Sequence, residues 1–265
     1  MAQTDWALLE DSLDGTEWQG ITVRRGPTHG ISGPVGGGDF VFGFNSVQSV
    51  SGAVGAYCAI EGYCPIEPRP VHEPGSSGGG GGAISAAMKK GPSAGKTNYS
   101  SFIFVGAQTN AVTGEAYLLG LENASPHRIV LAKGQIQNGI PSVSNPGLTK
   151  ILRYSQDTYD DNVWHQLRLD MVVNDNGDVL LWAYRNPIAE TEGVGDVTDP
   201  QWEPVVFNDG LEFADGLFVD DVLAVNSESA PLLSGYLGFG VQMADTARRC
   251  YFDHIQVIRQ MPPVV

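Results

Sequence analysis

The chain has 265 residues, of which 42% are hydrophobic and 17% are charged. Its 30 acidic and 15 basic side chains give a formal net charge of -15, and a field of that sign repels nucleic acids and anionic membranes. The composition therefore supports a hydrophobic core and excludes nucleic acid and membrane surfaces as expected partners. A chain of this length suits one large all-β domain or two small domains.

The N-terminal residues carry neither the basic stretch nor the apolar stretch of a signal peptide. No apolar run approaches the roughly 18 residues that span a bilayer. The three cysteines, Cys58, Cys64 and Cys250, are too few for a disulfide framework. We therefore expect synthesis in a cytoplasm without an export signal.

Residues 15–38 are rich in glycine, proline and threonine, and residues 6–13 are compatible with a strand or a short helix. We interpret 1–38 as an N-terminal arm or edge segment that packs on a single domain formed by 39–265. In the next segment, Phe40, Phe42 and Phe44 alternate with other residues. Alternation with a period of two predicts a strand with one buried aromatic face.

Residues 65–82 are predicted to form a long surface loop. Neither a helix nor a central strand accommodates closely spaced prolines, and this segment also ends in five consecutive glycines. The glycines do not indicate a phosphate-binding loop, because that loop needs a strand before it and a helix after it. The prolines concerned are Pro65, Pro68, Pro70 and Pro74.

From residue 83 onward, short strands recur at even intervals, and each ends near Gly, Asn, Pro or Asp. Many short strands with such turns are typical of an antiparallel sandwich or barrel. The expected strands are residues 84–89, 101–108, 116–122, 128–133, 148–154, 163–173, 179–184, 235–242 and 250–259.

Residues 163–186 predict a β-hairpin. Leu167, Leu169 and Met171 alternate with polar residues, and the turn 174–177 contains Asn, Asp and Gly, which tolerate the positive φ of hairpin turns. The second strand, 179–184, is apolar on both faces. This pattern predicts a strand inside a stack of layers.

These segments carry a family resemblance. Residues 117–122, 129–134, 163–170 with the following turn, 235–240 and 251–257 resemble the strands of concanavalin A-like or laminin-G-like jelly-roll domains. The resemblance covers about residues 83–260. It implies an all-β, antiparallel β-sandwich (jelly roll) with long Gly/Pro-rich loops.

Residues 218–221 and 248–254 resemble segments of virion structural proteins of tailed bacteriophages. This resemblance implies a non-enzymatic structural component of the virion, in the tail, the neck or the capsid. Its partners would be other virion proteins and copies of itself, contacted through loops such as 15–38 and 65–82. Long ordered loops usually have a functional reason.

A lectin-like module that binds host-surface glycans is the alternative. Sugar binding would use aromatic side chains in loops, and the candidates are Tyr159, Trp182 and Trp202. Tryptophans in a sandwich more often belong to the core, so the same residues also have a purely structural interpretation.

A glycoside hydrolase is the third interpretation, because several jelly-roll families are glycanases. Such enzymes place two carboxylates roughly 5–10 Å apart across a cleft. The Glu-x-Asp-x-Glu pattern of the resembling enzymes does not occur, and Glu212 and Asp215 have the wrong spacing. There is also no Gly-x-Ser-x-Gly motif. We therefore assign no catalytic residue.

We expect no cofactor and no metal site. Calcium is the one possibility that the resemblance adds, since related laminin-G-like domains hold it at a loop rim. Carboxylates are the hard oxygen ligands that calcium prefers. The candidates are Asp157, Asp160, Asp161, Asp220 and Asp221, for which a solvated acidic rim is the alternative.

Overall fold

The computed structural model describes most of the chain from residue 81 onward and five strands before it. The described residues are 6–11, 21–25, 28–32, 41–46, 54–60, 81–90, 99–109, 113–122, 127–160, 163–174, 176–188, 200–208, 216–221, 229–233, 235–243 and 248–260. None of the helices among these residues has the length and apolar character to cross a membrane.

Nine strands form the first sheet, which we call sheet A. Their order is β13-β12-β11-β6-β16-β4-β3, with β1 paired to β16 and β14 paired to β12. The strands are β1 (Trp6–Asp11), β3 (Thr28–Ser32), β4 (Val41–Ser46), β6 (Gly81–Lys90), β11 (His165–Val173), β12 (Val179–Asn186), β13 (Glu203–Pro204), β14 (Leu217–Asp220) and β16 (Arg248–Gln260).

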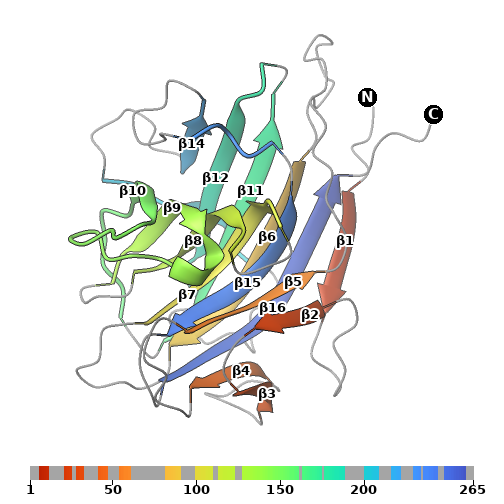
Figure 1. Cartoon of the computed structure of the whole chain (residues 1–265), viewed down its shortest axis with the longest axis vertical. Coiled ribbons are helices and arrows are strands. Elements are labelled where there is room, and N and C mark those ends of the chain that lie inside the picture. The colour runs from red at the N-terminus through yellow and green to blue at the C-terminus, as the bar shows by residue number, and fades with distance from the viewer. Residues whose placement is uncertain are drawn as a thin grey trace.

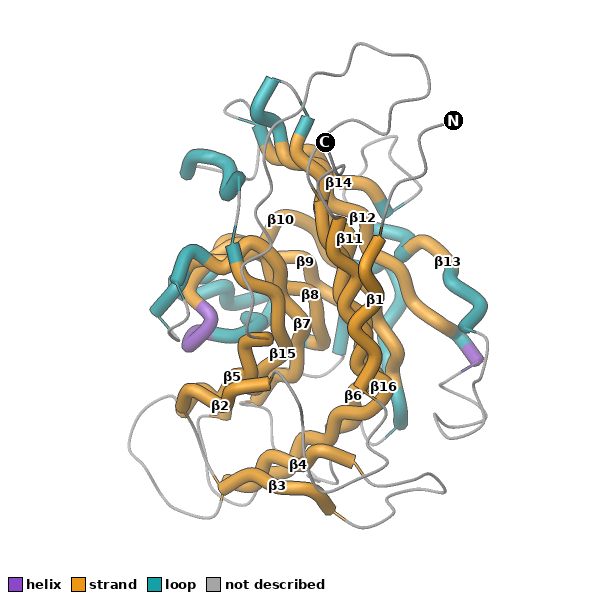
Figure 2. The backbone as a smooth tube through the Cα atoms, turned by 90° about the vertical axis from the view of Figure 1, so that its right-hand side faces the viewer, coloured by secondary structure: helices purple, strands orange, loops and turns teal. Residues whose placement is uncertain are grey.

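Seven strands form the second sheet, sheet B, in the order β10-β9-β8-β7-β15-β5-β2. They are β2 (Ile21–Arg25), β5 (Val54–Ile60), β7 (Tyr99–Ala107), β8 (Glu115–Leu121), β9 (Ile129–Gln135), β10 (Lys150–Tyr154) and β15 (Tyr236–Met243). The two sheets face each other as layers (Figures 1 and 2), and β10 lies at one edge of sheet B.

The main core lies between the two sheets. Ile103 of β7 and Leu119 of β8 enter it from sheet B, and Leu167 and Leu169 of β11 enter it from sheet A. Successive side chains of a strand point to opposite faces, so alternate residues of each strand fill this layer. The expected all-β antiparallel sandwich is confirmed.

A second apolar cluster covers the outer face of sheet B. Phe102, Phe104 and Leu118 of the sheet pack there against Ile140, which follows the short 3-10 helix η1 (Ile136–Asn138). The backbone N–H of Ile140 donates a hydrogen bond to Ser100 Oγ at 3.0 Å. The segment after β9 is therefore tied onto the sheet.

The predicted hairpin is confirmed as β11 and β12, with Gly177 at a φ of +82° in the turn. The expectation that both faces of residues 179–184 are buried is wrong. Leu181 and Ala183 are buried between the sheets, whereas Leu180 and Trp182 are only half-buried. Their side chains lie on the outer face of sheet A, which is only partly covered.

The N-terminal residues supply strands to both sheets, since β1 pairs with β16, β2 with β5 and β3 with β4. The domain boundary at residue 38 stays a prediction. The predicted loop 65–82 is too long by two residues, because Gly81 and Gly82 pair with β11. The preceding part of that loop lies outside the described residues.

Candidate functional site

A hollow of about 510 Å³ opens beside the connection between β10 and β11. We call it the pocket. Three separate stretches of chain build it: the connection itself, the first residue of β11 and the end of β12. The lining residues are Asp157, Thr158, Tyr159, Asp160, Val163, His165 and Arg185.

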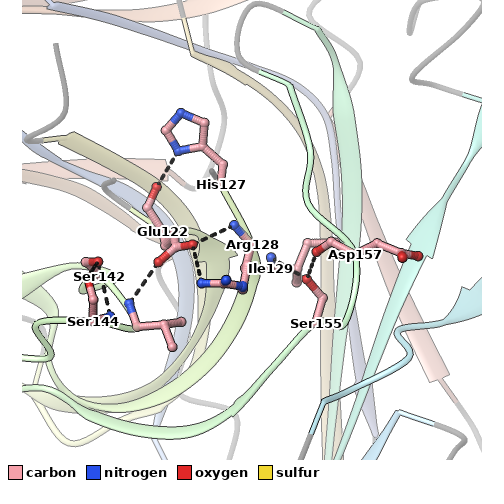
Figure 3. A network of polar contacts seen from close by, with 9 residues as sticks. Glu122, His127, Arg128, Ile129, Ser142, Ser144, Ser155 and Asp157 are labelled. Carbon is pink, nitrogen blue, oxygen red and sulfur yellow. Dashed lines mark hydrogen bonds and ion pairs between the residues drawn. The ribbon is translucent and has the colours of Figure 1, made fainter. Parts of the chain in front are cut away.

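Backbone hydrogen bonds fix the connection in place. The N–H of Tyr159 donates to the carbonyl of His127 at 2.7 Å. Ser155 Oγ donates to the carbonyl of Asp157 at 2.6 Å and accepts from the N–H of Ile129 at 3.0 Å (Figure 3). The described part of the pocket wall is therefore anchored to residues at and just before the start of β9.

Tyr159 contributes an aromatic ring to the pocket lining. Its ring is half-buried and packs against the main core. The His165 ring meets it edge-on, with the ring centroids 5.7 Å apart, and the Arg185 guanidinium lies 5.6 Å from its centroid. His165 Nε2 donates to the carbonyl of Asp160 at 2.9 Å, which sets the tautomer with a proton on Nε2.

The pocket carries charges of both signs. Asp157 and Asp160 are exposed at its rim, and Arg185 is half-buried, with Glu203 Oε2 3.7 Å from its Nη2. Carboxylates accept hydrogen bonds and a guanidinium donates them in a fixed planar geometry. The arrangement suits a ligand with many hydroxyl groups and some apolar surface.

Asp220, a predicted calcium ligand, does not lie at a solvated rim. It is buried between the sheets, where its Oδ2 accepts a hydrogen bond from Lys133 Nζ at 2.7 Å and another from the hydroxyl of Tyr117. The side chains of Lys133 and Asp220 are 1% and 0% exposed. Asp220 therefore neutralises a buried lysine, and the sequence-based assignment to a rim is wrong.

The partners of this buried cluster tie the segment before β15 to sheet B. Lys133 Nζ also donates to the carbonyls of Ser229 and Ala230, at 3.1 and 2.8 Å. The hydroxyl of Tyr117 accepts from the N–H of Leu232 at 2.9 Å. Burial, and then the charge of Asp220, raise the pKa of Tyr117 far above its ordinary value.

The other four calcium candidates do not all lie together. Asp157 and Asp160 come together in the pocket, Asp221 is half-buried after β14, and Asp161 lies outside the described residues. The part of the chain that the structure describes contains no group of three His, Cys, Asp or Glu side chains placed to hold a metal ion. A calcium site stays a prediction.

Of the three aromatic candidates for glycan binding, Tyr159 alone lines the pocket. Trp182 lies on the outer face of sheet A, where it pairs with Asp170 and Leu217 on the neighbouring strands. Trp202 is half-buried just before β13. The use of either tryptophan in binding stays a prediction.

Sequence reasoning assigns neither Arg185 nor His165 to a site, although both line the pocket. The predicted hairpin could have brought these two residues together, because a turn at 174–177 places both of them at the end of the hairpin opposite the turn. The register pairs Leu167 with Arg185, two positions from His165.

No protein-family model matches this chain, and no curated protein matches it. Solved structures do match it. The carbohydrate recognition domain of Emp46p, in a point-mutant form, is 11% identical and has a TM-score of 0.53, with 97% of this chain and 99% of that chain covered. The carbohydrate recognition domain of Emp47p is 10% identical, with a TM-score of 0.51 and coverage of 96% and 95%.

A marine PL-14 alginate lyase from Aplysia kurodai is also similar, at 8% identity and a TM-score of 0.53, with 96% of this chain and 98% of that chain covered. At such identities the likeness shows the fold alone, a concanavalin A-like sandwich of two antiparallel sheets. None of these three proteins is described as a phage protein. The resemblance to phage virion proteins stays a prediction.

Proposed function

We propose that this protein is a non-catalytic carbohydrate-binding sandwich and that the pocket is its sugar-binding site. The supporting observation is the pocket itself, where Asp157, Asp160, Tyr159 and Arg185 meet in one hollow. The likeness to two carbohydrate recognition domains supports the proposal by analogy of fold, which is a weaker argument than the site.

Each side chain has a distinct role in this proposal. The carboxylates of Asp157 and Asp160 accept hydrogen bonds from sugar hydroxyls, because they are exposed at the rim. The guanidinium of Arg185 donates to ring or hydroxyl oxygens from above the Tyr159 ring. Anchoring of the connection at His127 reduces the entropy that binding would otherwise cost.

The positions of the two pocket carboxylates favour binding over hydrolysis in this proposal. An inverting or retaining hydrolase places its two carboxylates on opposite sides of the scissile bond, with one of them in an apolar environment that keeps it protonated. Asp157 and Asp160 instead lie on one connection, and both are exposed to solvent. This placement favours binding without cleavage.

Calorimetric titration with a panel of uncharged oligosaccharides tests the proposal. Asp160→Asn keeps the shape of the side chain and the carbonyl that His165 binds, but removes the charge. Because one charge-assisted hydrogen bond is lost, we expect affinity to fall about tenfold. Asn176→Ala is the matched control, since Asn176 is exposed in the turn at the far end of the hairpin.

Three results would contradict the proposal. The panel would show no binding, the Asp160→Asn and Asn176→Ala proteins would bind equally well, or incubation with the bound oligosaccharide would release new chain ends. The first two results exclude the pocket as a site for such sugars. The third would show that the protein is an enzyme.

A further inference from the structure

A second hollow, of about 670 Å³, lies beside β10, the edge strand of sheet B. We call it the groove. Its two walls come from one continuous stretch of chain, the segment that leads into β10 and β10 itself. The lining residues are Val143, Pro146, Gly147, Leu148, Thr149, Lys150, Ile151, Leu152, Arg153 and Tyr154.

A buried carboxylate holds the wall of the groove at Val143. Glu122 is 1% exposed, and its Oε2 accepts a hydrogen bond from the N–H of Val143 at 2.8 Å. Its Oε1 accepts from the N–H of Arg128 at 3.1 Å and lies 3.4 Å from Nη1 of the same residue (Figure 3). This side of the groove is therefore held to the end of β8.

One feature of the groove favours an occupant. Leu148 is 88% exposed, although a large aliphatic side chain is stabilised by leaving water. A ligand with an apolar face would cover this side chain.

The charge in the groove differs from that of the whole chain. Lys150 and Arg153 are the charged residues among the ten that line it, whereas acidic side chains outnumber basic ones by 30 to 15 in the sequence. Arg153 is buried, with its Nη1 on the carbonyl of Leu217, and Lys150 is half-buried. Because both charged lining residues are basic, the lining favours an anionic group in the groove, whereas Asp157 and Asp160 disfavour one in the pocket.

We infer that the groove is a second carbohydrate subsite, which takes a sugar unit bearing a carboxylate or a sulfate. This inference rests on the proposed function, because it makes the ligand an extended polysaccharide that contacts both hollows. Tyr154 lines the groove and Asp157 lines the pocket, and three residues of extended chain span only about 10 Å. One polymer chain can therefore reach from one hollow to the other.

The test compares three oligosaccharides of equal length: one uronate-containing, one sulfated and one uncharged. Lys150→Gln should weaken binding of one or both charged probes about fivefold and leave the uncharged probe unchanged. The charged probe whose binding weakens shows whether the groove prefers a carboxylate or a sulfate. Leu148→Ser should weaken binding of all three probes. Asn176→Asp is the matched control, because it changes net charge by the same amount in an exposed turn.

The outcomes separate the two proposals. If the probes bind and Lys150→Gln has no more effect on the charged probes than Asn176→Asp, the groove is not a subsite, but the pocket still stands. If Lys150→Gln weakens binding and Asp160→Asn does not, the groove is supported and the pocket is excluded. If no probe binds to the wild-type protein, both proposals fail.

Discussion

Two sites in this sandwich combine acidic and basic side chains, and they differ in their access to water. In the cluster between the sheets, Lys133 and Asp220 are almost completely buried and lie 2.7 Å apart. At the pocket, Arg185 is half-buried and its Nη2 lies 3.7 Å from Oε2 of the exposed Glu203, and the exposed Asp160 belongs to the same pocket lining as Arg185. Residue type alone therefore does not separate a structural carboxylate from one that is available to a ligand.

The comparison shows that a buried charge needs partners within the protein, whereas an exposed charge can be solvated by water. A buried ion pair must satisfy its hydrogen bonds within the protein, and Lys133 does so with Asp220 and two backbone carbonyls. An exposed carboxylate remains hydrated and exchanges water for a ligand at little cost. The buried cluster should therefore control stability, and the pocket should control binding.

The largest expected effect is on the buried pair. Lys133→Met leaves the charge of Asp220 buried without its counter-charge, so we expect the free energy of unfolding to fall by about 3–5 kcal/mol. Arg185→Met removes one member of the partly exposed pair and should cost less than about 1 kcal/mol. Urea denaturation of the two variants measures both values, and equal losses would contradict the comparison.

Glu122→Gln should have an intermediate effect. The neutral amide weakens the hydrogen bond to the N–H of Val143 and removes the attraction to Arg128. We expect the free energy of unfolding to fall by about 1–3 kcal/mol. Hydrogen exchange at Val143 should become faster, and unchanged exchange there would show that Glu122 does not hold the wall of the groove.

Tyr117→Phe tests the buried cluster through its pH dependence. The pKa of Tyr117 is raised in the folded protein, so this group stabilises the fold below its ordinary pKa of about 10, and the stabilisation is lost as pH rises above that value. The wild-type protein should therefore lose stability more steeply between about pH 9 and pH 11 than the variant does. Parallel curves of unfolding free energy against pH would rule out this assignment.

The smallest expected effect on stability is in the pocket. Because the Asp160 side chain is exposed, Asp160→Asn should change the free energy of unfolding by less than about 0.5 kcal/mol. The same substitution should weaken sugar binding about tenfold. A large loss of stability would place Asp160 among the structural carboxylates.

The sequence predicts most of the sandwich, because strand alternation and turn residues are local signals. The hairpin illustrates this, since Leu167 and Leu169 face the core as their period of two requires. The half-exposed face of β12 is not predictable in the same way. Whether Leu180 and Trp182 are covered depends on other segments, which the local pattern does not report.

The candidate site is only partly predictable. Asp157, Asp160 and Tyr159 are recognisable because they are close together in a loop, and the structure places all three in the pocket. The assignment of Asp220 to a rim fails because its partner, Lys133, lies 87 positions earlier in the chain and on the other sheet. Pairing over such a distance is set by the packing of the two sheets.

The most direct test of the account is to locate a bound oligosaccharide by backbone amide NMR. We expect the largest chemical-shift changes at Asp157, Tyr159 and Asp160, with the amides of Lys133 and Asp220 unaffected. Shifts centred on the buried cluster, or on the hairpin turn at Asn176, would contradict the claim that the exposed acidic site binds the ligand and the buried one supports the fold.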